Sequence, residues 1–277
     1  MMRLGIHLPQ IGRKASPDGI RRAAMQGDAL GFADVWTSEH IITPAGAMYP
    51  PSPNFYDPVL TLTWAAACTR RVGLGTSVLV LPMRHPLPLA KELATLQNLS
   101  EGRLILGAGV GWLEAEFAAL GVPFNERGRR TDEGIAMMRA VWSDDPVSFE
   151  ARWIPAVIED MRMMPKPARP IPIWIGGTSD AALKRAVRLD GWHGSRATPE
   201  QAEPLVARLR ADRPDPEFAI SLRSAWDGRD DGALKERLQG FAAVGVGHVM
   251  VEPFDREIGD WLSSVERIAK AGAEFLG

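Results

Sequence analysis

Residues 103–112 read Arg-Leu-Ile-Leu-Gly-Ala-Gly-Val-Gly-Trp, a short apolar run that breaks into alternating glycines. Residues 171–178, which read Ile-Pro-Ile-Trp-Ile-Gly-Gly-Thr, follow the same pattern. Each stretch predicts a buried strand that ends in a loop with few side chains. Such a loop suits a place where a flat cofactor or a phosphate lies against bare backbone. We therefore expect one site built from the ends of several strands.

Strand patterns alternate with helix patterns along the rest of the chain, in eight pairs. The expected strands are 4–8, 34–37, 72–80, 104–107, 172–175, 191–194, 218–223 and 248–251. The expected helices are 17–30, 58–69, 86–99, 130–142, 180–189, 199–211, 231–243 and 258–275. Because the strands are apolar and the helices amphipathic, the pattern predicts parallel pairing with both faces of the sheet covered. Eight such units favour an α/β fold of the (β/α)8 TIM barrel type, with residues 1–277 forming a single domain.

Two segments depart from the repeat. Residues 43–56 are rich in proline and small residues and follow the second strand, where barrel enzymes place active-site loops. Residues 145–169 form an insertion between helix 4 and strand 5, which is long for a plain connection. We expect this insertion either to form a small hairpin or lid over the barrel mouth or to cover only the outside of the barrel.

Composition narrows the classes of partner. The formal net charge of −2, from 32 basic and 34 acidic residues, provides no overall field that would attract nucleic acid or an anionic membrane. The single cysteine, Cys68, excludes an internal disulfide and fits an inert core thiol. The first residues show no signal-peptide pattern, and no apolar run reaches the roughly 18 residues of a membrane span. We expect a cytoplasmic protein without nucleic-acid or membrane partners.

The histidines give no metal signature. His7, His40, His85, His193 and His248 lie far apart in the sequence, without a two-histidine helical spacing or a Cys/His cluster. No Gly-x-Ser-x-Gly elbow of a serine hydrolase occurs either. We therefore predict neither a metal site nor a serine nucleophile.

Glu39 and His40 are the candidate catalytic pair. They follow the second strand directly, at the end where barrel enzymes hold their catalytic groups. A histidine there can exchange a proton with a substrate near neutral pH, and a neighbouring carboxylate can fix its tautomer. A purely structural Glu-His pair at a loop start is the alternative.

The turn Gly176-Gly177-Thr178-Ser179 joins the fifth strand to a helix and predicts a phosphate cradle. Free backbone amides, the hydroxyl groups and the helix dipole would all favour an anion there. Ser179 or Asp180 acting only as the helix cap is the alternative. The Gly109-Val110-Gly111 turn resembles a dinucleotide fingerprint only loosely, so we discount a Rossmann site.

Four segments together resemble a known family. They are Glu39-His40 after strand two, the run Gly-Thr-Ser-Val-Leu-Val-Leu-Pro-Met-Arg-His-Pro from residue 75, the glycine-rich fourth strand and the Ile-Pro-Ile-Trp-Ile-Gly-Gly-Thr-Ser segment. The chain resembles the luciferase-like flavin monooxygenase superfamily, and most closely its branch of oxidoreductases that use the deazaflavin coenzyme F420. One departure is Trp112, which stands where some deazaflavin enzymes carry a catalytic glutamate, so their sugar-phosphate substrate is in doubt here.

The resemblance implies roles for particular residues. His40 would face the substrate and Glu39 the polar edge of the cofactor ring. A strand-three bulge with a cis peptide at Ser77-Val78 would support the back of the ring. The remaining cofactor-binding positions implied are the glycines and threonine at the ends of strands four and five: Gly109, Gly111, Gly176, Gly177 and Thr178.

The sequence therefore predicts an oxidoreductase that transfers a hydride between F420 and a small organic substrate, with the protein supplying position and electrostatics. One alternative is an FMN-dependent monooxygenase that uses dioxygen on the same barrel. Another is a non-catalytic flavin- or deazaflavin-binding protein. We expect the protein to form a homodimer.

Overall fold

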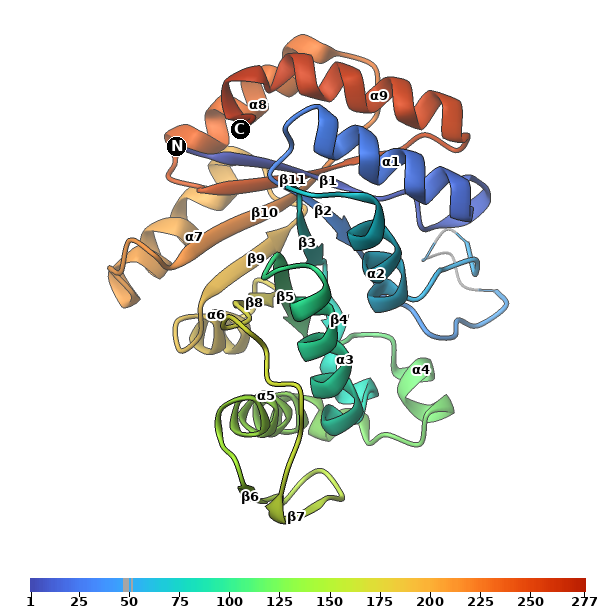
Figure 1. Cartoon of the computed structure of the whole chain (residues 1–277). Coiled ribbons are helices and arrows are strands. Elements are labelled where there is room, and N and C mark those ends of the chain that lie inside the picture. The colour runs from blue at the N-terminus through green and yellow to red at the C-terminus, as the bar shows by residue number, and fades with distance from the viewer. Residues whose placement is uncertain (47–49, 51) are drawn as a thin grey trace.

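The computed structural model describes residues 1–46, 50 and 52–277 of the chain. Its main sheet is parallel, and it closes because β3 pairs with both β2 and β5 (Figure 1). The strands of this sheet, in chain order, are β1 (Arg3–His7), β2 (Asp34–Thr37), β3 (Gly73–Thr76), β4 (Leu79–Val80), β5 (Leu104–Gly109), β8 (Ile173–Gly176), β9 (Gly191–Ser195), β10 (Ala219–Trp226) and β11 (His248–Pro253). Because β4 continues β3 after a short interruption, these two segments count as one strand of the barrel. The barrel therefore has eight strands, and the predicted (β/α)8 fold is confirmed.

Helices cover the outside of the barrel. Those that match predicted helices are α1 (Pro17–Ala29), α2 (Pro58–Cys68), α3 (Pro86–Leu99), α5 (Arg127–Ser143), α6 (Asp180–Ala186), α7 (Pro199–Asp212), α8 (Asp231–Ala243) and α9 (Ile258–Ala271). Several begin at a polar cap followed by proline: the Ser16 side chain accepts the Gly19 amide, and Thr198 forms a capping box with Gln201. The sequence did not predict the short helix α4 (Glu114–Ala119).

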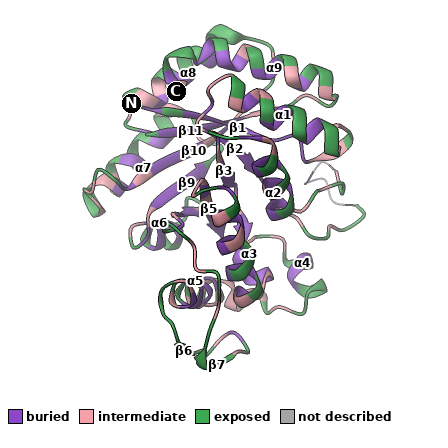
Figure 2. Ribbon diagram, viewed as in Figure 1, coloured by how far each residue is buried: buried purple, intermediate pink, exposed green. Residues whose placement is uncertain are grey.

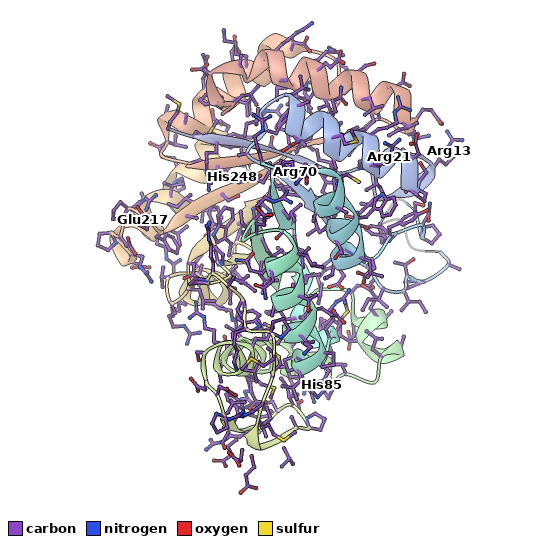
Figure 3. All side chains as sticks on the ribbon, in the orientation of Figure 1. Arg13, Arg21, Arg70, His85, Glu217 and His248 are labelled. Atoms are coloured by element: carbon purple, nitrogen blue, oxygen red, sulfur yellow. The ribbon has the colours of Figure 1, made fainter. Side chains whose placement is uncertain are left out.

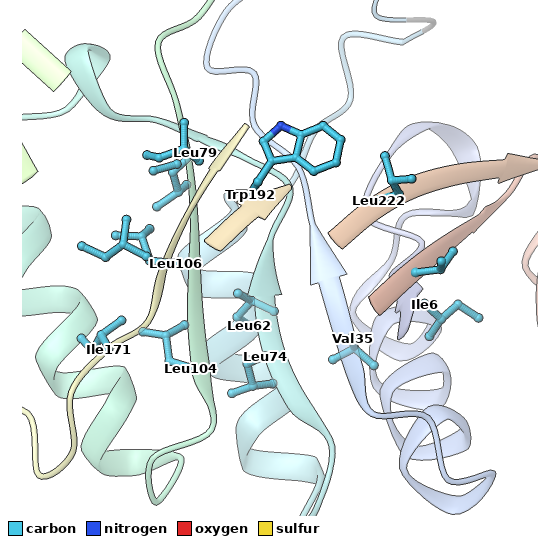
Figure 4. Close-up of a cluster of buried hydrophobic side chains, with 14 of the residues drawn as sticks. Ile6, Val35, Leu62, Leu74, Leu79, Leu104, Leu106, Ile171, Trp192 and Leu222 are labelled. Atoms are coloured by element: carbon cyan, nitrogen blue, oxygen red, sulfur yellow. The ribbon is translucent and has the colours of Figure 1, made fainter. Parts of the chain in front are cut away.

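The core has two parts. Apolar side chains such as Val35, Leu62 and Leu74 are fully buried between the strands and the helices (Figure 4). Figure 2 shows that the buried residues lie along the strands and on one side of the surrounding helices. Inside the barrel, Trp36 and Trp174 pack with Met250 in a separate buried cluster. Side chains therefore fill both faces of the strands, which explains their near-continuous apolar sequence.

The strand-three segment contains the predicted bulge. Gly75 pairs with Ile105, and pairing resumes where Leu79 meets Ala108. The strand-three segment advances by four residues between these pairs, whereas β5 advances by three. One extra residue therefore lies at Ser77-Val78. The peptide bond between these two residues is cis, as expected. The bulge interrupts the sheet near the carboxyl end of the third strand of the barrel.

The insertion forms an antiparallel hairpin of β6 (Val147–Glu150) and β7 (Val157–Met161). The Glu133 carboxylate of α5 accepts three backbone amides of the connecting loop, at 2.7, 2.8 and 2.7 Å. In Figure 1 the hairpin lies beyond α5, away from the barrel strands. The expected hairpin is therefore present, its connecting loop is anchored on α5, and no residue of the insertion lines either of the two cavities described below.

The predicted active-site loop 43–56 includes positions 47–49 and 51, which lie outside the described residues. In the remainder of this loop, Phe55 forms an isolated antiparallel bridge with Ile11. Among all residues that the structure describes, no helix combines the length and the apolar character needed to span a bilayer.

Candidate active site

Two adjoining cavities open at the carboxyl ends of the strands, with volumes of about 280 Å³ and about 1330 Å³. The smaller cavity is lined by eight of the nine residues predicted for the site, which are Glu39, His40, Ser77, Val78, Gly109, Gly111, Gly176 and Gly177. Thr178 is exposed and belongs to the lining of neither cavity. Segments far apart in the sequence thus meet at one place, as the pattern of strand ends predicts.

His40 lies in the wall of the smaller cavity, where Glu116 of α4 holds it. The His40 Nδ1 atom lies 2.8 Å from Glu116 Oε2, and both side chains are at least nine-tenths buried. The other carboxylate oxygen accepts the amides of Ile41 at 2.8 Å and Ile42 at 3.2 Å. Because a carboxylate can only accept, Nδ1 carries the hydrogen, and Nε2 is the basic nitrogen of the neutral ring.

Glu116 stays ionised in this position. Burial acts to raise the pKa of its carboxyl group, but the hydrogen bonds from His40 and the Ile41 amide outweigh burial and hold that pKa below its ordinary value. Sequence reasoning missed Glu116 as a partner of His40, since it lies 76 residues further along the chain in a helix that the pattern did not predict.

The Glu39 carboxylate is held by contacts within the protein, although Glu39 borders the cavity. Its side chain is fully buried, with one carboxylate oxygen 2.5 Å from the Val80 amide nitrogen and the other 2.6 Å from Arg84 Nε. Arg84 also contacts Asp57, at 2.6 Å. The carboxylate therefore positions β4 and the partly buried guanidinium group of Arg84 rather than extending toward a ligand.

Ser77 is held through its backbone and its side chain. Its amide donates to the Thr37 carbonyl at 2.6 Å, and its carbonyl accepts from Arg223 Nη1 at 3.1 Å. The Ser38 hydroxyl lies 3.1 Å from the same carbonyl. The Ser77 hydroxyl oxygen lies 2.8 Å from His193 Nε2. Every polar group of this bulge residue thus has a partner, which fixes the cavity wall rigidly.

The glycines at the strand ends make room for Val78. A Cβ atom added to Gly109 would lie 2.5 Å from Val78 Cγ2, and one added to Gly176 would lie 2.9 Å from Val78 Cγ1. A Cβ atom on Gly111 would lie 2.5 Å from Val80 Cγ1. We expected these glycines to expose bare backbone to a ligand. The structure shows that bulge side chains occupy much of the space they leave, although the glycines still line the cavity.

Gly109→Ala is expected to lower the free energy of unfolding by about 2 kcal/mol, because overpacking a filled site displaces its neighbours. Adding Val78→Ala should recover part of this loss, since the nearest remaining Val78 atom, Cβ, is 3.6 Å from the new methyl group. Denaturant unfolding of both single variants and the double variant measures the coupling. Strictly additive losses would show that Val78 does not fill the space beside Gly109.

Some polar groups of the predicted phosphate cradle already form hydrogen bonds within the protein. Ser179 is the N-cap of α6 and accepts the Ala182 amide, which is the alternative that the sequence left open. Gly177 has a φ of 107°, which favours glycine, and its carbonyl accepts from Trp192 Nε1 at 2.7 Å. Across the described residues, no three histidine, cysteine or carboxylate side chains form a group suited to a metal ion.

Comparison with known proteins decides the family. Residues 2–273 match the family described as luciferase-like monooxygenase. The chain belongs to this family. The resemblance inferred from the four sequence segments is therefore confirmed, and this luciferase-like protein is an enzyme.

Individual relatives of this luciferase-like enzyme span most of its length. An uncharacterised protein of Mycobacterium tuberculosis is 32% identical over 199 residues, which cover 68% of each chain. The F420-dependent glucose-6-phosphate dehydrogenase of Intrasporangium calvum is 29% identical over 290 residues, covering 94% of this chain and 84% of the relative. The solved structure of an F420-dependent secondary alcohol dehydrogenase in complex with an F420–acetone adduct has a TM-score of 0.80 at 16% identity, covering 98% of both chains. At this identity the solved structure supports the fold alone.

Proposed function

We propose that this luciferase-like enzyme transfers a hydride between the deazaflavin coenzyme F420 and a small organic substrate. The observation that carries the proposal is the His40–Glu116 pair in the wall of a cavity whose lining also includes the Ser77-Val78 bulge. The relatedness to an F420-dependent dehydrogenase supports the choice of coenzyme. When bound, the coenzyme would supply a carbon that accepts or donates hydride and reacts poorly with oxygen.

The lining of the two cavities fits a flat ring with a polar extension. In the smaller cavity, Ser77, Val78 and the strand-end glycines at 109, 111, 176 and 177 would hold the ring. Thr178, at the exposed rim, would contact a more distant part of the coenzyme. The larger cavity is lined by five basic residues and two acidic ones, and this excess of positive charge suits an anionic extension: Arg13, Lys14, Arg196, Arg223 and Arg256, with Glu252 and Asp255.

His40 would handle the substrate proton. Its Nε2 atom would accept the proton that a substrate hydroxyl loses on oxidation, or return that proton in the reverse direction. Glu116 would stabilise the imidazolium ion by accepting from Nδ1. Glu39 would act through the backbone of β4, so we now assign it a positioning role in place of direct contact with the ring.

Titration of the protein with F420 and with FMN tests the coenzyme. We expect F420 to bind at least tenfold more tightly, a difference of about 1.4 kcal/mol, measured by fluorescence. A tenfold preference for FMN together with substrate-dependent oxygen consumption would support the monooxygenase alternative. Tight binding without turnover of any substrate would support a carrier protein.

We further propose that the protein is a cytoplasmic homodimer without nucleic-acid or membrane partners. Native mass spectrometry of protein purified from its own host would measure the mass of both the assembly and the retained cofactor.

A further inference from the structure

Beneath the cavity, five side chains form a continuous hydrogen-bonded row through the barrel interior. Ser77 Oγ lies 2.8 Å from His193 Nε2, and His193 Nδ1 lies 2.7 Å from Ser221 Oγ. Ser221 Oγ lies 2.6 Å from His248 Nδ1, and His248 Nε2 lies 2.8 Å from Asp34 Oδ1. Because Ser77 borders the cavity while Asp34 and His248 begin their strands, the row runs from the mouth toward the amino-terminal end of the barrel. His248 is labelled among the strands in Figure 3.

Aromatic rings enclose this row. The Trp36 ring stacks on His193 with centroids 4.8 Å apart and an angle of 5° between the planes. Trp174 packs edge-on against His248 at 5.5 Å. All five members of the row are buried. Gly5 keeps the far end compact, since a Cβ atom there would come within 2.0 Å of Asp34 Oδ1. An enclosed row of this kind can exchange protons with the cavity only at Ser77 and His193, the two members that line it.

The carboxylate sets the direction of the hydrogen bonds. Burial acts to raise the pKa of Asp34, but the interactions with His248, together with the hydrogen bond from Trp36 Nε1, outweigh burial and keep that pKa low, so Asp34 accepts. His248 therefore donates from Nε2, and Ser221 donates to His248 Nδ1. His193 then donates from Nδ1 to Ser221, and Ser77 donates to His193 Nε2.

Burial and nearby charges keep the His193 ring neutral. Burial, followed by repulsion from His248 and Arg223, lowers the pKa of His193 to about 3. His7 adds to this repulsion, whereas Asp34 opposes it. At the far end, Arg3 helps to stabilise the Asp34 carboxylate. A proton that enters the row is therefore not retained on His193.

We propose that this row is a proton relay between a ligand atom at Ser77 and the His248–Asp34 pair. A proton arriving at Ser77 Oγ sends that hydroxyl's own hydrogen to His193 Nε2, the Nδ1 hydrogen to Ser221, and the Ser221 hydrogen to His248 Nδ1. Each step breaks one O–H or N–H bond and forms the next, so the net change is one proton on His248. Once His248 holds that extra proton, the reverse sequence returns it to the ligand.

The ligand class that needs such a relay is a ring whose nitrogen gains a proton on two-electron reduction, as in F420 or FMN. This part of the proposal rests on the proposed function. His40 and the relay then have separate tasks: His40 exchanges the substrate proton, and the relay stores the proton that the ring loses on oxidation and returns it when the ring is next reduced. The relay thus adds His193, Ser221, His248 and Asp34 to the residues that serve the reaction, and it gives Ser77 a second role.

The first test needs no cofactor. In protein labelled with ¹⁵N-histidine, NMR at mildly alkaline pH should show His193 protonated on Nδ1 and His248 on Nε2. Ser221→Ala removes the acceptor of His193, so the His193 proton should move to Nε2, where it can donate to Ser77. Ser224→Ala is the matched control, because Ser224 is also buried on β10 but is not a member of the row. A His193 proton on Nε2 in the natural protein would overturn the relay.

The second test measures proton movement. With bound coenzyme, Ser221→Ala should slow turnover about tenfold or more and raise the solvent deuterium isotope effect, whereas Ser224→Ala should leave both nearly unchanged. Ser77→Ala interrupts the row at the cavity end and should give the same pattern even if Ser221→Ala folds poorly. Turnover of both relay variants at the control rate would overturn the relay and leave the proposed function intact. Failure to bind F420 would overturn the proposed function without changing the NMR result.

Discussion

His40→Ala should lower turnover about a hundredfold or more while the affinity for the coenzyme stays nearly unchanged. The reason is that Nε2 is the basic nitrogen in the cavity wall, whereas the expected coenzyme contacts come from Ser77, Val78 and the strand-end glycines. Steady-state kinetics and a coenzyme titration of the same preparation measure the two quantities. Unaltered turnover would reduce His40 to a packing residue.

Two companion variants sharpen this experiment. Glu116→Gln keeps the shape of the side chain but removes the charge that stabilises the imidazolium ion, so turnover should fall by a smaller factor than in His40→Ala. His85→Ala is the matched histidine control, because His85 caps α3 by accepting the Leu87 amide and borders neither cavity. A loss of turnover in His85→Ala equal to that in His40→Ala would point to general damage to the fold.

Glu39→Ala should have the largest effect on stability. The substitution leaves the Val80 amide without its acceptor and removes one of the two carboxylates that pair with Arg84, whose side chain is 17% exposed. Removing one partner of a buried ion pair costs about 3 kcal/mol, which should lower the melting temperature by roughly 6 to 12 °C in a chain of this size. Calorimetry of the cofactor-free protein measures the change.

A surface pair provides the comparison. Glu257 contacts Arg13 at 2.8 Å, but its side chain is 60% exposed, so Glu257→Ala should cost about 1 kcal/mol or less. Equal losses for the two variants would contradict the structural role of Glu39. Glu39→Gln keeps an acceptor for the Val80 amide and should fall between the natural protein and Glu39→Ala.

The sequence predicts the barrel well because its signal is local. The predicted strand at 34–37 and the predicted helix at 231–243 agree with β2 and α8 at both ends, since buried runs and capped amphipathic segments carry their own boundaries. The eight predicted residues that meet in one cavity follow from the rule that parallel strands present their carboxyl ends together.

What the sequence could not predict depends on contacts between distant segments. His193 and His248 showed no recognisable spacing, yet Ser221 of a third strand links them. Glu116 reaches His40 from a helix that lacks a strong periodic signal. The glycines were correctly placed at the site, but which side chain fills the space beside them depends on the position of Val78.

The extra residue at Ser77-Val78 also changes which face of the strand each later residue occupies. In an uninterrupted strand alternate residues share a face. Gly75 faces the inside of the barrel beside Trp36, so regular alternation would put Leu79 on the inside and Val80 against the helices. The observed arrangement is the opposite: Leu79 joins the outer core, and Val80 borders the cavity. The bulge therefore shifts the alternation of side chains between the two faces of the strand by one residue. Flattening the bulge without removing a residue would exchange these two faces and turn Val80 toward the helices, whereas deleting one of the two bulge residues would keep Leu79 and Val80 on their present faces.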